Sequence, residues 1–456
     1  MNKKTSILSG KRFGVISLGC DKNRVDTEKL LGRLKERNCT LTDDVSKADI
    51  LIVNTCAFLQ SARMEAIETI LEYAVYKERN LEKIVVTGCL PQKFIDELYL
   101  PLQEADVFLG IEDYEKIFES LEESYRTGER QNYVGKGKDG YRIPRVLTTD
   151  EHVAYLKIAD GCYNHCTYCL IPKIRGKYRS YPMEFLLEEA ESLGDISELI
   201  LVAQDTTRYG EDLYGKNRFV DLLQALSKLD NIQKIRLLYC YPDVITDELI
   251  EEIASNEKIV KYLDIPLQHS ENRILKLMNR KGKREEYLAL IQKLKQRIPE
   301  IAIRSTFISG FPSETEEEFE GMKDFLRKAQ FASCGFFAYS KEPDTAAFRM
   351  KNQVHHATKK RRVKVLYEIQ EKISAQRLQN YVGREIEIVC DGIDYAKSCF
   401  IGRADFQAPD IDGKVYFNAL KANQGERYVV YVDRADSYDL YAYTKEYYEE
   451  NLGGTL

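Results

Sequence analysis

Short apolar runs alternate with amphipathic stretches along most of this 456-residue chain. Between residues 11 and 127 the apolar runs are RFGVISLGC, ADILIVNTC, KIVVTGC and ADVFLGI, and helical spacing separates them. Strands that are apolar on both faces and alternate with helices form a parallel sheet covered on both sides. The pattern therefore predicts a doubly wound α/β domain over residues 11–127.

The same alternation returns between residues 148 and 378 with a longer period. Six runs are candidate strands: HVAYLKIADGC, ELILVAQD, KIRLLYCY, KYLDIPLQH, IAIRSTFISG and SCGFFAY. Six βα units predict a partial TIM-like (βα)6 barrel with its active site at the carboxyl ends of the strands. We interpret the polar residues 126–150 as a linker. We interpret 355–381, with its basic run Lys359, Lys360, Arg361, Arg362 and Lys364, as a solvated linker helix rather than a binding patch.

After residue 381 the texture changes to short β-type runs separated by turn residues, which predicts a small antiparallel β-barrel over 381–450. Residues 381–456 hold 14 acidic and 8 basic residues, so this segment accounts for the whole formal charge of −6. Its mean field repels phosphate, which favours a basic partner over a nucleic acid.

The chain shows no sign of export or membrane insertion. No run approaches the ~18 apolar residues of a membrane span. The first residues, MNKKTSILSGKRFG, lack the apolar core of an export signal. We therefore expect a cytoplasmic protein without a membrane partner, whose 11 cysteines are reduced and available for metal or redox roles.

The strongest local motif is Cys162-x3-Cys166-x2-Cys169, on a loop that follows a predicted strand. Three thiolates at this spacing hold three irons of a [4Fe–4S] cluster and leave the fourth iron open. An open iron can bind S-adenosylmethionine (SAM) and start radical chemistry. Tyr168 suits a position beside the adenine. Two alternatives stay open: zinc with His165 as fourth ligand, and a closed ferredoxin-type cluster.

Three further cysteines end neighbouring strands of the first predicted domain. Cys20, Cys56 and Cys89 each follow an apolar run and precede a helix. Because parallel strands present their carboxyl ends on one edge of the sheet, the three side chains can converge on a second cluster. The alternative is that they are ordinary buried cysteines. No ligand role is assigned to Cys39, Cys240, Cys334, Cys390 and Cys399.

The order of these cysteines, followed by a small β-domain, resembles the radical-SAM methylthiotransferases over nearly the whole chain. The resemblance implies an auxiliary [4Fe–4S] cluster on Cys20, Cys56 and Cys89. It implies a SAM-binding [4Fe–4S] cluster on the triad at 162–169 and a terminal TRAM domain. SAM and an external electron donor would complete the system.

Two branches of that family differ in substrate: one modifies a tRNA adenosine, the other an aspartate of small-subunit ribosomal protein twelve. LGCDKNRVDTE at 18–28 and LVAQDTTRYG at 201–210 resemble the ribosomal-protein branch. LDIPLQH at 263–269 and RSTFISGFPSET at 304–315 are shared by the wider family. Asp21 departs from the branch, which more often has proline there. We expect the ribosomal protein as substrate and do not expect tRNA.

The implied reaction uses two SAM molecules. One supplies a methyl group to a sulfur at the auxiliary cluster, and the other yields a radical that takes hydrogen from the aspartate β-carbon. Both clusters must then face one cavity between the first two domains, because a primary radical acts at contact distance. The alternatives are a tRNA methylthiotransferase, an iron–sulfur electron carrier and a zinc-stabilised binding protein.

Other candidate residues lie at the predicted barrel rim. Gln204 and Asp205 end the second strand, where the SAM amino group is held in many radical-SAM enzymes. Gln268 and His269 end the fourth strand, and Arg304 in the fifth can pair with a carboxylate.

Gly310, Phe311 and Pro312 are candidates to line the adenine. The alternative for all of these rim residues is packing or a solvated loop. Four basic residues after the triad either steer SAM or substrate or are surface charge: Lys173, Arg175, Lys177 and Arg179.

Overall fold

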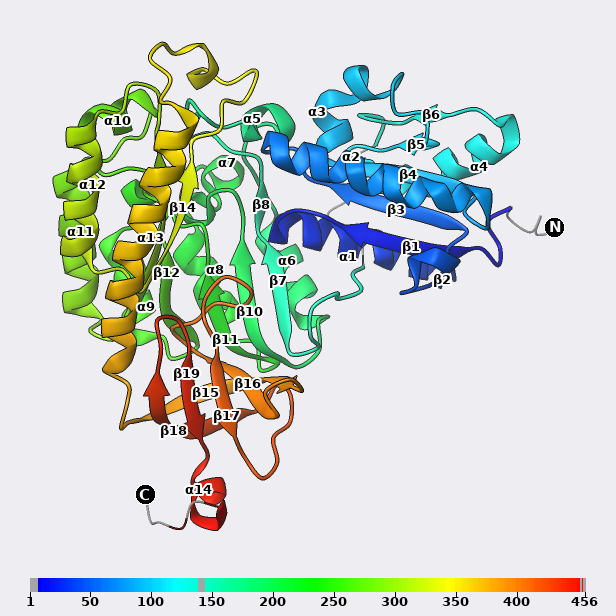
Figure 1. Ribbon diagram of the computed structural model, residues 1–456. Coiled ribbons are helices and arrows are strands. Elements are labelled where there is room, and N and C mark those ends of the chain that lie inside the picture. Colours follow the sequence, from blue (N-terminus) through cyan, green and yellow to red (C-terminus); the bar gives the residue numbers. More distant parts are fainter. Residues whose placement is uncertain (1–6, 138–143, 452, 454–456) are drawn as a thin grey trace.

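The computed structural model describes residues 7–137, 144–451 and 453. Three bodies are visible in Figure 1: a layered α/β domain, a larger strand-and-helix barrel beside it, and a small β-barrel below the larger one. Within the described residues, no helix is both long and apolar enough to cross a bilayer.

The first domain is a parallel sheet with strand order β2-β1-β3-β4-β5-β6. Apolar side chains of α1 and α4 pack on one face, and those of α2 and α3 pack on the other. The predicted doubly wound topology is confirmed. Its strands are β1 (Arg12–Ser17), β2 (Thr40–Leu41), β3 (Ile50–Thr55), β4 (Lys83–Gly88), β5 (Val107–Phe108) and β6 (Gln131–Asn132). Its helices are α1 (Asp21–Glu36), α2 (Gln60–Ala74), α3 (Cys89–Leu98) and α4 (Ile117–Thr127), with 3₁₀ turns η1 (Val45–Lys47), η2 (Val75–Glu78) and η3 (Tyr114–Lys116).

The segment 126–150 is more than the linker we predicted. Its strand β6 joins the sheet beside β5. Farther on, the backbone of Val146 donates to the carbonyl of Glu28 on α1 at 3.1 Å. Gly32 permits this approach, because a Cβ there would lie 1.7 Å from the carbonyl oxygen of Pro144. Residues 138–143 of the predicted linker lie outside the described residues.

The second body is an open barrel of six parallel strands in the order β14-β13-β12-β11-β10-β7. This confirms the predicted partial (βα)6 barrel. The strands are β7 (Val153–Lys157), β10 (Ile196–Val202), β11 (Ile232–Leu237), β12 (Ile259–Asp264), β13 (Ala302–Ser309) and β14 (Ser333–Ala338). A short antiparallel pair, β8 (Ala159–Asp160) and β9 (Arg179–Ser180), was not predicted.

Helices separate the barrel strands. The longer ones are α6 (Met183–Glu191), α8 (Phe219–Leu226), α9 (Asp247–Ser255), α11 (Arg284–Arg297) and α12 (Glu316–Ala329). Short ones are α5 (Ile171–Ile174), α7 (Glu211–Tyr214), α10 (Asn272–Leu277), and the 3₁₀ turns η4 (Thr206–Arg208), η5 (Pro242–Val244) and η6 (Ala347–Arg349). Their apolar faces build one large core with the strands.

Helix α13 (His356–Gln379) packs along α12 and β14, and its basic run is not a solvated face throughout. Lys359 is buried and donates to the carbonyl of Tyr339 at 2.9 Å. Arg362 is buried and pairs with Glu314 at 2.5 Å. The interpretation as surface charge is wrong for these two residues, because their partners lie on other elements.

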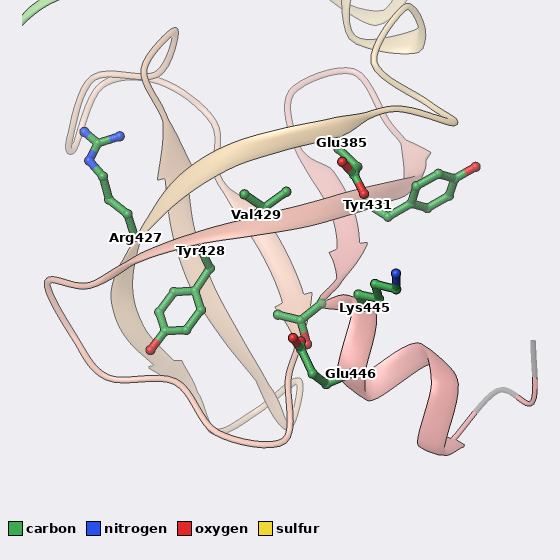
Figure 2. Close-up of a pocket in the computed structure, with 8 residues that line it drawn as sticks. Glu385, Arg427, Tyr428, Val429, Tyr431, Lys445 and Glu446 are labelled. Atoms are coloured by element: carbon green, nitrogen blue, oxygen red, sulfur yellow. The ribbon is translucent and has the colours of Figure 1, made fainter. Parts of the chain in front are cut away.

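The third body is a closed barrel, β15-β16-β17-β19-β18. It matches the predicted small barrel except that β17 and β19 pair in parallel. Its strands are β15 (Glu385–Asp394), β16 (Cys399–Ala404), β17 (Val415–Asn418), β18 (Arg427–Ala435) and β19 (Leu440–Tyr443), followed by α14 (Lys445–Asn451). A cavity of about 340 Å³ lies against β18 and the start of α14, and Glu385 and Glu446 line it together with Val429 (Figure 2).

Buried ion pairs fasten the small barrel to the large one. Glu198 on β10 bonds to Arg236 and also pairs with Arg403 of β16 at 2.7 Å. The hydroxyl of Tyr262 donates to Asp412 at 2.7 Å. Three acidic residues of the third body also lie within 4.0 Å of basic side chains of the other two bodies: Asp405 near Lys234, Asp410 near Arg24 and Asp412 near Arg304. Its net charge is therefore a weaker guide to its partner than the sequence suggested.

Candidate active site

The three cysteines of the first domain lie at the carboxyl ends of adjacent parallel strands. Cys20 caps α1 after β1, Cys56 follows β3, and Cys89 opens α3 after β4. Gly19 has φ +103°, and a Cβ there would lie 2.8 Å from the Cβ of Cys56. A glycine is required because two cysteine-bearing loops meet at this point.

One side chain, Asn23, ties the three loops together. Its amide nitrogen donates to the carbonyls of Leu18 and Thr55 at 3.0 and 3.1 Å. Its amide oxygen lies 3.6 Å from the sulfur of Cys89. Leu18 lies two residues before Cys20, Thr55 directly precedes Cys56, and the third contact is to Cys89 itself. Asn23 therefore fixes the mutual placement of the three cysteine loops.

The same three cysteines share an electrostatic environment. The pKa of Cys89 is raised to about 12, chiefly by burial; Arg175 opposes the rise, and Cys20 and Cys56 add to it. Burial likewise raises the pKa of Cys56, with Cys20 adding to the rise. Thiols that are hard to ionise, such as those of Cys56 and Cys89, suit a site in which a bound cation takes the place of the protons.

The second cysteine set lies on the loop between β8 and α5. The backbone of Cys162 donates to the carbonyl of Gly176 at 3.2 Å. Backbone N–H groups of Asn164 and Ile171 donate to the sulfurs of Cys162 and Cys169, each at 3.4 Å. Burial raises the pKa of Cys162 to about 11.

The pKa of the Cys169 thiol is raised by burial, and Cys166 and Cys162 add to the rise. The backbone of Cys169 donates to the carbonyl of Cys166 at 3.0 Å. N–H groups aimed at sulfur stabilise thiolates, as a cluster requires. His165, the fourth ligand of the zinc alternative, is exposed. Within residues 7–137, 144–451 and 453, no three His, Cys, Asp or Glu side chains, the six predicted ligand cysteines included, are grouped for a single metal ion. The side-chain grouping alone therefore favours neither zinc nor a cluster.

The amide of Gln204 is a strong candidate contact for a bound polar ligand. It follows β10, and both Nε2 and Oε1 are buried without a hydrogen-bond partner among the described residues. Leaving a buried amide unsatisfied costs about 1–3 kcal/mol, and native structures rarely do so. A bound polar group that pairs with this amide removes the cost.

Asp205, next to Gln204, holds the triad loop. Its carboxylate accepts from Asn164 at 2.8 Å and from the hydroxyl of Thr207 at 2.6 Å. Its pKa is raised by burial, against the opposing effect of these hydrogen bonds and Arg208. With both oxygens engaged, Asp205 acts on the cysteine loop through Asn164, and direct contact with SAM stays a prediction.

The predicted site residues at the ends of the fourth and fifth strands form hydrogen bonds and ion pairs within the barrel. His269 is fully buried, and its Nε2 lies 3.3 Å from Glu314. The same carboxylate accepts from the backbone of Gly310 at 2.7 Å. Gln268 follows β12 in the positive-φ region, at +73°. Arg304 pairs with Asp264 of its own chain at 3.0 Å.

Aromatic residues pack around Tyr168, which lies within the triad loop. Phe311 is buried and belongs to one apolar cluster with Tyr339, against which Tyr168 packs. Pro312 is buried as well. Gly310 has φ +76°, and a Cβ there would lie 2.4 Å from Lys359, so a side chain is excluded. The predicted adenine contacts of this group stay predictions.

Of the four basic residues after the triad, Arg175 is not surface charge. It is buried and pairs with Asp160 at 2.9 Å and with Asp26 of α1 at 3.0 Å. Lys157 of β7 joins the same carboxylates, so four buried charges bridge the first two domains. Lys173 and Lys177 are exposed, and Arg179 pairs with Glu112.

Sequence reasoning missed the polar residues that α1 buries. Asn23, Asp26 and Glu28 are all less than 3% exposed, and Glu28 pairs with Arg145 from the segment after α4. The available signal was the motif DKNRVDTE itself: its seven polar residues are spread over every side of about two helix turns instead of lying on one solvent-facing side.

A cavity of about 390 Å³ lies between the first domain and the barrel. Gln92 and Glu112 line it from one side, and Asp160, Ile174 and Arg175 from the other. None of the six predicted ligand cysteines is among its described lining residues. A chamber shared by both cysteine sets therefore stays a prediction.

Three family models match the chain in this order. Residues 12–110 match the uncharacterized protein family UPF0004, residues 156–326 the Radical SAM superfamily, and residues 382–444 the TRAM domain. The chain is 46% identical over 435 residues to the ribosomal protein uS12 methylthiotransferase RimO of Lachnoclostridium phytofermentans, covering 93% of this chain and 98% of the relative. The RimO protein of a Thermoanaerobacter species is 45% identical, with 94% and 99% covered. The chain belongs to the RimO family of methylthiotransferases.

The resemblance inferred from the sequence is thus confirmed. Membership of the Radical SAM superfamily means that the protein uses SAM and a [4Fe–4S] cluster. Among solved structures, the radical SAM methyltransferase TsrM from Kitasatospora setae has a TM-score of 0.52 at 14% identity, covering 74% of this chain and 73% of that one. The cobalamin-dependent radical enzyme OxsB has a TM-score of 0.50 at 13% identity, with 80% and 56% covered. At these identities the likeness concerns the fold.

Proposed function

We propose that this protein adds a methylthio group to the β-carbon of an aspartate in small-subunit ribosomal protein uS12. The RimO relatives, which match nearly the full chain at 42–46% identity, are named as methylthiotransferases of ribosomal protein uS12. The β-carbon of an aspartate as target is what the resemblance to the family implies. The single structural observation that supports it is the pair of cysteine sets on either side of the buried Arg175 network, one per domain.

In this proposal Cys162, Cys166 and Cys169 hold the SAM-binding [4Fe–4S] cluster. Cys20, Cys56 and Cys89 hold a second, auxiliary cluster. When bound, the first cluster supplies the electron that cleaves SAM to a radical able to remove hydrogen from unactivated carbon, and the second supplies the sulfur site that carries the methyl group.

Neighbouring side chains of this protein hold the two cysteine-bearing regions in place. Asn23 fixes the auxiliary loops, and Asp205 fixes the triad loop through Asn164. The unpaired amide of Gln204 is the best-supported contact for a polar group of SAM. The domain boundaries 11–127, 148–378 and 381–450 remain predictions, as do a cytoplasmic location, an external electron donor and the absence of a membrane partner.

Mass spectrometry of uS12 from cells with and without this gene tests the proposal. We expect a methylthio group on an aspartate of uS12 that disappears on deletion and returns with the wild-type gene, but not with Cys162→Ala or Cys89→Ala. Nucleoside analysis of tRNA from the same cells tests the alternative. Unmodified uS12 together with loss of a methylthiolated adenosine would replace this proposal with the tRNA activity.

A further inference from the structure

Arg175 follows helix α5 of the barrel domain, but its side chain contacts the proposed auxiliary cluster site of the first domain. Its Nη2 atom lies 3.6 Å from the sulfur of Cys89 and donates to the amide oxygen of Asn23 at 2.5 Å. Asn23 is the residue that ties the three auxiliary loops together. The guanidinium therefore touches both a proposed cluster ligand and the side chain that orients the others.

A short hydrogen-bonded segment joins Arg175 to the other cysteine set. The sulfur of Cys169 accepts from the backbone of Ile171 at 3.4 Å, and the carbonyl of Ile171 accepts from the backbone of Arg175 at 2.8 Å. Helix α5 is thus a single turn with a proposed ligand of the first cluster before it and the cap Arg175 after it. Helix α5 and its two hydrogen bonds thus connect the cysteine loop of the barrel to the guanidinium that contacts Cys89.

The charge on Arg175 is held in place by the network around it. The side chain is about 1% exposed, and Asp26, Asp160 and Lys157 bring the four charges to neutrality. In such a site a hydrogen bond from a cation to a ligand sulfur is scarcely screened. Hydrogen bonds and positive charge at cluster sulfurs stabilise the more negative, reduced cluster.

We propose that Arg175 is a positioning residue that raises the reduction potential of the auxiliary cluster. The inference rests on the proposed function, because it requires a cluster on Cys20, Cys56 and Cys89. It assigns a role to a residue of the radical-SAM segment at the opposite cluster.

The test isolates the auxiliary cluster by changing Cys162, Cys166 and Cys169 to alanine in the full chain. Anaerobic dithionite titration, followed by electron paramagnetic resonance, then reports one-electron reduction of the remaining cluster. Arg175→Gln leaves Asp26 and Asp160 with one cation, so the charge-balanced variant Arg175→Gln with Asp160→Asn is measured beside it. Lys173→Gln removes the same charge from an exposed position on α5 and is the control.

We expect both Arg175 variants to need a more negative potential, with the reduced-to-oxidised ratio at a fixed potential falling about tenfold, or about 59 mV. Lys173→Gln should match the parent. An unchanged potential in the charge-balanced variant, at full iron content, would overturn the role of Arg175. Absence of any cluster in the parent would instead refute the auxiliary cluster itself, so the two failures are distinguishable.

Discussion

The hydroxyl of Tyr239 donates a hydrogen bond to the carboxylate of Asp21 at 2.9 Å, joining the end of barrel strand β11 to the residue that follows Cys20. Tyr239 adopts φ +60°, and the ammonium of Lys22 lies 3.2 Å from its ring centroid. A non-glycine residue in this region stores strain, which persists where the surroundings fix it. Asp21, which departs from the family's more usual proline, thus gives this chain a tie between its barrel and its Cys20 loop.

Removing that hydroxyl should loosen the Cys20 loop. We expect Tyr239→Phe to lower the free energy of unfolding by about 1 kcal/mol. We also expect faster iron loss to a chelator from the protein in which the 162–169 triad is changed to alanine. Tyr395→Phe, at a position 85% exposed, is the control and should change neither quantity. Equal chelation rates in the two variants would contradict the tie.

The unpaired amide of Gln204 predicts opposite effects on stability and binding. Gln204→Leu removes a buried polar group without a partner, so unfolding should cost the same or about 1 kcal/mol more than in the wild type. SAM affinity of the reconstituted enzyme should fall about tenfold, because the contact offered to the ligand is gone. Equilibrium dialysis and urea unfolding measure the two quantities. Wild-type SAM affinity would show that the amide faces no part of SAM.

Arg145 should be essential to the joint between α1 and the barrel. It pairs with Glu28 and, at 2.6 Å, with Glu189, and all three side chains are buried. Arg145→Met leaves two buried carboxylates short of a partner, so we expect a loss of about 3–5 kcal/mol in unfolding free energy. Arg126→Met breaks an exposed pair with Glu123 and should leave the urea midpoint close to that of the wild type. Similar urea midpoints for the two variants would contradict this account.

Acid should weaken the attachment of the small barrel. Burial alone would raise the pKa of Glu198, but Arg236 and Arg403 bring it down from 4.5 to about 2. A lowered folded-state pKa gives stability that is fully present above about pH 4.5 and is lost as the pH falls towards 2, by about 3 kcal/mol in total.

Unfolding free energies measured between pH 7 and pH 3 test this sign. Glu198→Gln should be less stable than the wild type at pH 7, since it leaves two arginines without their carboxylate, and should lose less stability on acidification. A parallel pH profile for the two proteins would show that Glu198 does not contribute to the acid sensitivity.

The spacing of apolar residues predicted the architecture of all three domains, because each domain has a different pattern. Apolar runs between helices predicted both parallel sheets, and they correctly placed Cys20, Cys56 and Cys89 after three neighbouring strands. A cluster on these three cysteines stays a prediction. The parallel pairing of β17 with β19 was beyond reach, because short alternating runs do not encode strand direction.

The sequence analysis did not identify which charged side chains are buried. Arg175 and Arg362 look like surface residues in sequence, yet their partners Asp26 and Glu314 lie on other elements. Local spacing cannot reveal a pair separated by 149 residues. Arg304 was expected to pair with a carboxylate, and it does so with Asp264 at the end of the neighbouring strand β12.

The central claim is that two sets of three cysteines each hold a [4Fe–4S] cluster. Iron and sulfide analysis with Mössbauer spectroscopy, on anaerobically reconstituted protein, tests it directly. We predict about eight irons per chain in the wild type, and about four when either Cys20, Cys56 and Cys89 or Cys162, Cys166 and Cys169 are changed to alanine. About four irons in the wild type, unchanged when the first set is removed, would contradict the account.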